Sequence, residues 1–142
     1  MAIQKIMVAF DDSELAEAAL AVALDLAKGR EGATVDVVYV TALPSTAFVN
    51  VPDAASMLDV IASHSDRAFV HAKELVENAD VPCEVSLLSG TSAAALLLKH
   101  AAETEADLIV MGSRGKRGFT EQFGSVSHAV LHGAKVPVLI TK

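Results

Sequence analysis

Residues 106–115 read ADLIVMGSRG, an apolar run that leads directly into a glycine-rich segment. The run at 108–111 has the composition of a strand that is buried on both faces of a parallel sheet. Gly112 and Gly115 follow it, and the pair Gly124-Ser125 comes shortly afterwards. The pattern predicts a buried strand, then a glycine-rich loop, then the start of a short helix.

A loop of this kind can bind a phosphate without any catalytic side chain. Glycines let backbone N–H groups approach an anion closely, and the start of a helix adds its positive dipole end. Three basic residues, Arg114, Lys116 and Arg117, occur in the same segment of a chain with a formal net charge of −7. We interpret the segment as the polyphosphate half of a nucleotide site. The alternative is a tight strand-to-helix connection whose basic side chains are simply solvated.

Length and composition indicate a single globular domain over residues 1–142. Hydrophobic residues make up 52% of the 142 residues, enough to build an ordered core. No apolar stretch reaches the roughly 18 residues that a membrane span needs. The first ten residues resemble a strand rather than a signal peptide, and the lone Cys83 allows no internal disulfide. We therefore expect a cytoplasmic protein without a membrane partner.

The charge balance argues against a nucleic-acid partner. Nucleic-acid binding relies on an excess of Lys and Arg, whereas this chain has 11 of them against 18 Asp and Glu. The chain has no Trp and one Tyr, so a base-stacking platform is not expected either.

Hydrophobic periodicity predicts alternating strands and helices along the whole chain. We expect strands at 3–10, 34–40, 83–88, 107–111 and 136–141, and helices at 15–27, 54–78, 92–103 and 125–132. This order predicts an α/β fold, a three-layer α/β/α sandwich around a five-stranded, mostly parallel sheet. A loop at 41–53 is long enough to be functional, and its Phe48 is a candidate to cover a bound base.

The predicted sheet also predicts where a ligand binds. In open parallel sheets, ligands lie beyond the carboxyl ends of the strands. That rim would carry Asp11-Asp12-Ser13, the residues after Val40, Gly90 and the glycine-rich segment at 112–115.

Three stretches together resemble the universal stress protein family over the full length of the chain. They are IMVAFDDS at 6–13, ADLIVMGSRG at 106–115, and GSVS at 124–127 followed by VPVLI at 136–140. The resemblance implies a Rossmann-like fold related to the adenine nucleotide alpha hydrolases. It also implies an ATP-binding branch of the family, whose mark is Gly-x2-Gly-x9-Gly-(Ser/Thr).

The chain departs from that mark in one place. Gly112 and Gly115 have the first spacing, but eight residues separate Gly115 from Gly124, one fewer than the pattern. The permissive backbone of Gly118 can absorb the deletion; alternatively, Gly124 and Ser125 shift away from the phosphates. Asp12 also stands where the family commonly has a glycine.

The resemblance implies a role for each matching residue toward ATP, or toward AMP or ADP. Asp11 would accept hydrogen bonds from the ribose hydroxyls, and the backbone of Val40 would meet the adenine edge. Gly112, Gly115, Gly124 and Ser125 would hold the phosphates, with Ser113, Arg114, Val126 and Ser127 as further contacts. Mg²⁺ would accompany ATP, without protein ligands that the sequence identifies.

Several of these residues also have purely structural interpretations. Asp11 with Glu14 has the spacing of a capping box, and Ser125 is a candidate N-cap of the last helix. His128 and His132 have the i, i+4 spacing of a metal pair, but no third ligand at a fixed spacing supports one. Cys83 is expected to be buried as a small hydrophobe.

Three functions compete on the sequence alone. The first is a small nucleotide-binding regulatory or stress-response protein, with at most slow ATP hydrolysis. The second is a true NTPase or nucleotidyl transferase, but the sequence contains no Gly-x4-Gly-Lys-(Ser/Thr) loop. The third is an interaction module of the same fold that no longer binds nucleotide, an interpretation that the shortened loop favours.

The last strand predicts how the chain associates. Residues 136–141 read VPVLIT, an apolar stretch expected at the edge of the sheet. An exposed apolar edge strand invites pairing. The family resemblance implies a symmetric homodimer through this strand, an isologous contact.

Overall fold

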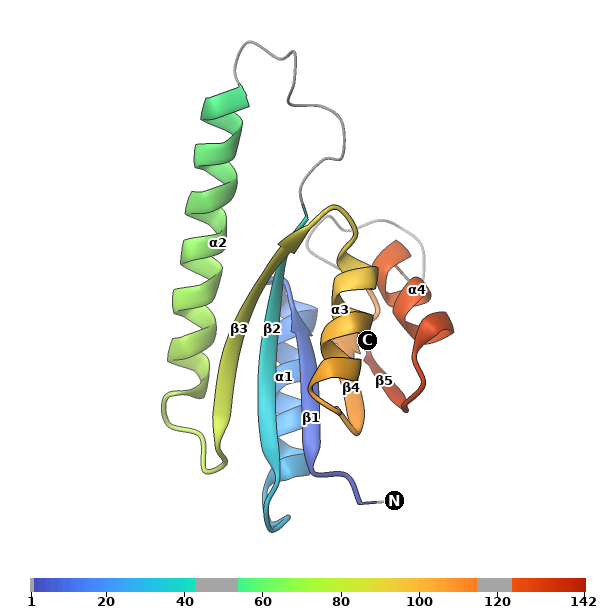
Figure 1. The fold of residues 1–142 in the computed structure, drawn as a ribbon. Coiled ribbons are helices and arrows are strands. Elements are labelled where there is room, and N and C mark those ends of the chain that lie inside the picture. The colour runs from blue at the N-terminus through green and yellow to red at the C-terminus, as the bar shows by residue number, and fades with distance from the viewer. Residues whose placement is uncertain (1, 43–53, 115–123) are drawn as a thin grey trace.

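The computed structural model describes residues 2–42, 54–114 and 124–142, and in these ranges strands and helices alternate (Figure 1). The strands are β1 (Lys5–Phe10), β2 (Thr34–Ala42), β3 (Cys83–Gly90), β4 (Leu108–Gly112) and β5 (Val138–Thr141), and the helices are α1 (Glu14–Ala27), α2 (Ala54–Val76), α3 (Ala93–Glu103) and α4 (Ser125–Gly133). Every expected element is present, and no bound moves by more than two residues. Phe48, Gly115, Lys116 and Arg117 lie outside the described residues.

The sheet has the order β3-β2-β1-β4-β5, and all its neighbouring strands are parallel. The chain builds β1, β2 and β3 outward in one direction, then crosses to the other side of β1 for β4 and β5. The order therefore reverses between β1 and β4. Such a switch point opens a crevice at the carboxyl ends of the two strands, where ligands of open α/β sheets bind.

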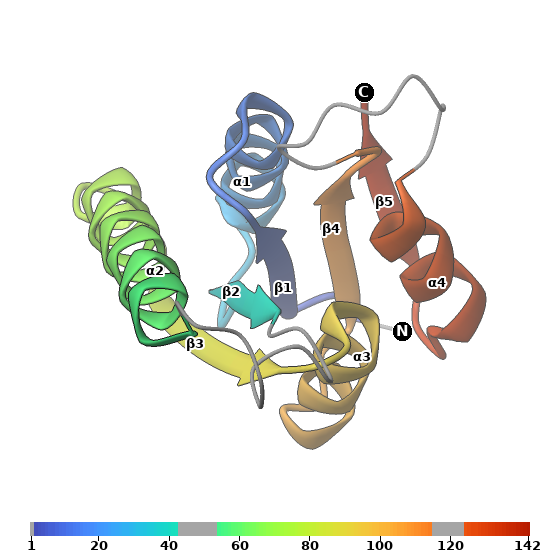
Figure 2. The ribbon, with the colours of Figure 1, turned by 90° about the horizontal axis from the view of Figure 1, so that it is seen from above.

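Helices cover both faces of the sheet, which confirms the three-layer sandwich (Figure 2). Helices α1 and α2 cover one face, and α3 and α4 cover the other. On the α1 face, one row of apolar side chains crosses all five strands in register: Val85, Val37, Val8, Val110 and Leu139. Val8, Val37 and Val110 are fully buried. The middle of the sheet is therefore part of the core, and it holds the carboxyl ends of the strands in place.

Helix α1 begins and ends where its capping residues lie. The Ser13 hydroxyl accepts a hydrogen bond from the N–H of Ala16 at 3.1 Å. At the other end, Gly29 follows the C-cap residue Lys28 and has a φ of +80°, a left-handed conformation that glycine adopts without strain. This is the position at which the sequence predicted the helix to close.

Three residues singled out in the sequence lie apart from the rim. Cys83 is half-buried at the start of β3 and packs against the core, and burial raises the pKa of its thiol. His128 and His132 are exposed on α4, and their rings stack with centroids 5.9 Å apart.

Of the helices that the structure describes, none has the length and apolar character that crossing a bilayer requires.

Candidate functional site

The switch point between β1 and β4 brings together three segments that are far apart in the sequence. Asp11 follows β1, Ser113 and Arg114 follow β4, and Gly124 precedes α4. Because β1 and β4 are hydrogen-bonded neighbours, their carboxyl ends lie side by side. The sequence predicted this rim, and the structure assembles its described residues there.

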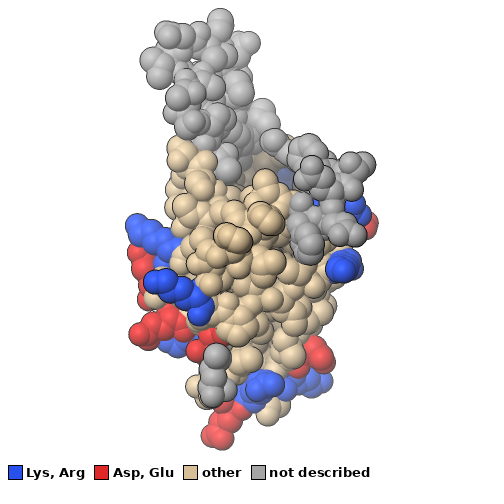
Figure 3. Space-filling view, turned by 90° about the vertical axis from the view of Figure 1, so that its right-hand side faces the viewer, with Lys and Arg blue, Asp and Glu red and all other residues tan. Residues whose placement is uncertain are grey.

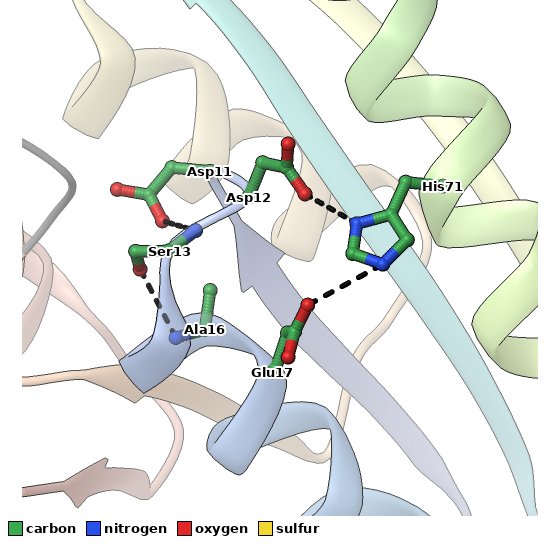
Figure 4. A network of polar contacts seen from close by, with 6 residues as sticks. All are labelled: Asp11, Asp12, Ser13, Ala16, Glu17 and His71. Carbon is green, nitrogen blue, oxygen red and sulfur yellow. Dashed lines mark hydrogen bonds and ion pairs between the residues drawn. The ribbon is translucent and has the colours of Figure 1, made fainter.

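The turn after β1 presents two carboxylates to opposite sides (Figure 4). Asp11 accepts a hydrogen bond from the N–H of Ser13 at 3.1 Å, an Asx-type turn that orients its carboxylate. Asp12 has a φ of 66°, and this left-handed residue places Ser13 at the N-cap of α1. The capping box predicted from Asp11 to Glu14 is therefore wrong, because Ser13 occupies the N-cap.

The two ends of the glycine-rich segment are joined directly. The N–H of Gly124 donates to the carbonyl oxygen of Ser113 at 2.6 Å. The hydroxyl of Ser127 is directed at the same oxygen at 2.8 Å and at the carbonyl of Gly124 at 3.0 Å. Both serines are buried, and the N–H of Ser113 donates to the carbonyl of Thr141 on β5. These contacts fix the start of α4 beside the end of β4.

The N-terminus of α4 has no side-chain cap among the described residues. Its N-cap is Gly124, and the helix begins at Ser125 as the sequence predicted, so the alternative interpretation of Ser125 as the N-cap is wrong. By contrast, α1 and α3 are each capped by a serine hydroxyl. The first-turn N–H groups of a helix lack intrahelical partners, so this helix start is suited to an anion.

The two described motif glycines have different structural requirements. A Cβ on Gly112 would lie 2.8 Å from the Cβ of Leu15, so the close packing of β4 against α1 requires this glycine. A Cβ on Gly124 would lie 3.4 Å from the nearest atom, the Cα of Arg114, which is an ordinary contact. Gly124 also has an extended backbone that any residue adopts, with φ −70° and ψ 161°. Among the residues that the structure describes, neither packing nor backbone conformation requires a glycine at position 124.

The remaining predicted contacts lie around the same rim. Val40 is half-buried in β2, in register with Leu88 of β3 and packed on the core. Arg114 is exposed after β4, and Val126 is 36% exposed in the first turn of α4. Their roles toward a ligand stay predictions.

Sequence reasoning missed one cluster at this rim. His71 of α2 contacts Asp12 and Glu17, with its Nδ1 2.5 Å from Asp12 Oδ1 and its Nε2 3.4 Å from Glu17 Oε1 (Figure 4). Fifty-nine positions separate His71 from Asp12, so no local spacing indicates the contact.

Comparison with known proteins finds relatives along the whole chain. Universal stress protein YxiE of Bacillus subtilis is 33% identical over 147 residues, covering 97% of this chain and 98% of its own. Universal stress protein Rv2005c of Mycobacterium tuberculosis is 34% identical over 142 residues, covering 96% of this chain. The chain spans only 45% of that relative's length.

A solved structure and a family model agree with these relatives. The universal stress protein from Archaeoglobus fulgidus in complex with dAMP is 27% identical, with a TM-score of 0.72 over all of both chains. Residues 2–142 match the model of the universal stress protein family. The chain therefore belongs to the universal stress protein family.

Proposed function

We propose that this chain is a small regulatory or stress-response protein that binds an adenine nucleotide, ATP, ADP or AMP, in the crevice between β1 and β4. The observation that carries the proposal is the start of α4. Its first-turn N–H groups lie beside the end of β4. Among the described residues, no side chain caps them, and no contact requires the glycine at position 124. A bound phosphate accounts for both features.

The other rim residues fit the parts of the nucleotide that remain. In this proposal the oriented carboxylate of Asp11 accepts hydrogen bonds from the ribose hydroxyls, and the backbone of Val40 contacts the adenine edge. The phosphates lie against Gly112, Gly115, Gly124 and Ser125, with Ser113, Arg114, Val126 and Ser127 around them. Mg²⁺ bound to the phosphates of ATP would offset their charge.

The dAMP complex of the Archaeoglobus relative supports an adenine nucleotide as the ligand. A regulatory role in the cytoplasm is favoured over an NTPase because the sequence lacks a Gly-x4-Gly-Lys-(Ser/Thr) loop, which NTPases use to grip the β- and γ-phosphates. Slow hydrolysis of ATP is compatible with the same binding mode.

Calorimetric titration of the nucleotide-stripped protein with ATP and Mg²⁺ tests the proposal. We expect saturable binding with a stoichiometry of one nucleotide per chain, and competition by ADP and AMP. Turnover measured in the same samples separates a regulator from an NTPase. If a folded sample shows no heat with any of the three nucleotides, the chain is an interaction module.

We also propose that the chain forms a homodimer through β5. This strand lies at one edge of the sheet, and the face that includes α4 and β5 is largely free of charged side chains over its middle (Figure 3). Exposed apolar side chains on α4, Val126 and Leu131, extend that surface. A second copy of the chain would bury both the edge and the apolar surface.

Ile140→Pro is expected to convert the dimer to a monomer. The carbonyl of Pro137 accepts a hydrogen bond from Ile109 of β4, and that of Thr141 accepts one from Ser113, the residue after β4. Because backbone groups alternate along a strand, the N–H of Ile140 points to the open edge. Proline removes that donor without breaking the ladder to β4. Sedimentation velocity reads the result, with Ile140→Val as the control that keeps both packing and N–H. An Ile140→Pro protein that sediments as a dimer would exclude this interface.

A further inference from the structure

The cluster of Asp12, Glu17 and His71 connects two helices that cover the same face of the sheet. His71 lies on α2, Glu17 lies on α1, and Asp12 lies in the turn that leads into α1 (Figure 4). The His71 ring also lies against Phe10 at the end of β1, with centroids 6.3 Å apart. The cluster is therefore next to Asp11, the residue that we propose for the ribose.

The positions of the two carboxylates determine the state of the ring. Asp12 lies against Nδ1 and Glu17 lies against Nε2. A neutral imidazole has one N–H donor and one lone pair, so one carboxylate would face a lone pair. Only the imidazolium both donates to Asp12 and places a positive charge beside Glu17. One ligand atom from each of Asp12, Glu17 and His71 lies within 4.8 Å of the others, so a metal ion is the competing occupant of this cluster.

The surrounding charges favour the same state. On α2, His71 shares a shallow surface hollow with Asp66, Arg67 and Glu74. The hydrogen bond that His71 donates to Asp12 is the largest cause that raises the pKa of His71, and the charges of Asp12, Glu17 and Glu74 raise it further against partial desolvation. On β2, burial and the charges of Asp11 and Asp12 raise the pKa of Tyr39, which therefore stays neutral.

The backbone of Asp12 explains why the contacts of His71 with Asp12 and Glu17, here called the clamp, are needed at this point. Asp12 adopts a φ of 66°, a left-handed conformation that costs a non-glycine residue some strain. Ion pairing with α2 offsets that strain. We infer that His71, as an imidazolium held between Asp12 and Glu17, is a positioning residue for the turn that carries Asp11, and that nucleotide binding therefore depends on pH.

The direction of the pH dependence follows from the sign of the shift. His71 titrates higher in the folded protein than its usual value of 6.5. The clamp is complete below that usual value and is lost as the pH rises through the folded pKa. This inference rests on the proposed function for its effect on nucleotide, whereas the clamp itself is measurable without nucleotide.

The first experiment follows the histidine ring signals by NMR without nucleotide, in buffer containing EDTA. We expect His71 to titrate above about 6.5 in the wild type and to return toward that value in Asp12→Asn. The exposed His64, seven residues earlier on α2, is the internal control and should not change between the proteins. A His71 pKa at the usual value in the wild type would overturn the clamp.

The second experiment measures ATP affinity in the presence of Mg²⁺ from about pH 6.5 to about pH 9. The wild type should weaken by about two- to fivefold across the His71 titration, the range for an exposed ion pair. Asp12→Gly keeps the left-handed turn without the clamp and should lose this dependence. Titration of the phosphates is common to both proteins and cancels, and His64→Gln should behave as the wild type does.

The outcomes separate the clamp from the nucleotide proposal. No ATP binding at any pH, with a raised His71 pKa, contradicts the nucleotide site and the positioning role but leaves the ion pair. Equal pH slopes in the wild type and Asp12→Gly overturn the positioning role. If Zn²⁺ shifts the His71 signals in the wild type but not in Asp12→Asn, the cluster is a metal site and the clamp is overturned.

Discussion

Replacing Gly124 with aspartate is expected to abolish nucleotide binding while leaving the fold at least as stable. Gly124 is the N-cap of α4 and has an extended backbone. An aspartate there can accept from the first-turn N–H groups and interact with the positive helix end, which stabilises a helix by up to about 1 kcal/mol. Its carboxylate would take the place that we propose for a phosphate and would repel the nucleotide.

The opposite signs of the two effects distinguish a lost site from a damaged fold. Calorimetry should show affinity for ATP reduced by at least about 10-fold, equivalent to about 1.4 kcal/mol. Thermal unfolding of the same protein should give a melting temperature equal to or above that of the wild type. Gly124→Ser caps the helix without a charge and is the matched control, so it should retain more affinity. Tight ATP binding by Gly124→Asp would show that the phosphates do not bind at the start of α4.

The sequence predicted the elements well because each strand carries its own burial pattern. Leu108, Ile109 and Val110 were expected to be buried and are 5%, 1% and 0% exposed. The bounds differ where distant pairing decides them. Strand β2 continues past Val40 to Ala42 because these residues pair with the end of β3, through Gly90. No local pattern contains that information.

Helix starts show the same division between local and distant causes. Serine is a stronger N-cap former than glycine, so local propensity favoured Ser125 over Gly124. In the structure the carbonyl of Gly124 already accepts from the N–H of His128, and its own N–H is held by Ser113. The tertiary contact with β4 therefore sets the first residue of α4.

The site was predictable in its position but not in all its parts. The order of elements and the glycine pattern identified the rim, and the shortened spacing raised the question of whether Gly124 is displaced from it. The bond from Gly124 to Ser113 shows that the two described ends of the segment lie together. His71 was missed because its partners lie on another helix and at a strained turn.

Gly112→Ala is expected to lower the free energy of unfolding by about 1–3 kcal/mol, the usual cost of overpacking. The added methyl would lie 2.8 Å from Leu15 Cβ and 3.3 Å from the carbonyl oxygen of Arg114. Neither atom is the far end of a flexible side chain, so β4 and α1 must move apart. Urea unfolding with an unchanged dependence on denaturant measures the loss.

Gly124→Ala is the matched control, because its methyl meets Arg114 Cα at an ordinary 3.4 Å. It should cost less than about 1 kcal/mol, the penalty for a poorer N-cap. The pair separates the two reasons for a glycine in this motif: close packing of β4 on α1 at Gly112, and access of a ligand to α4 at Gly124. If Gly112→Ala unfolds as the wild type does but no longer binds ATP, packing is not the reason for Gly112, and the phosphates approach the end of β4 as closely as they approach α4.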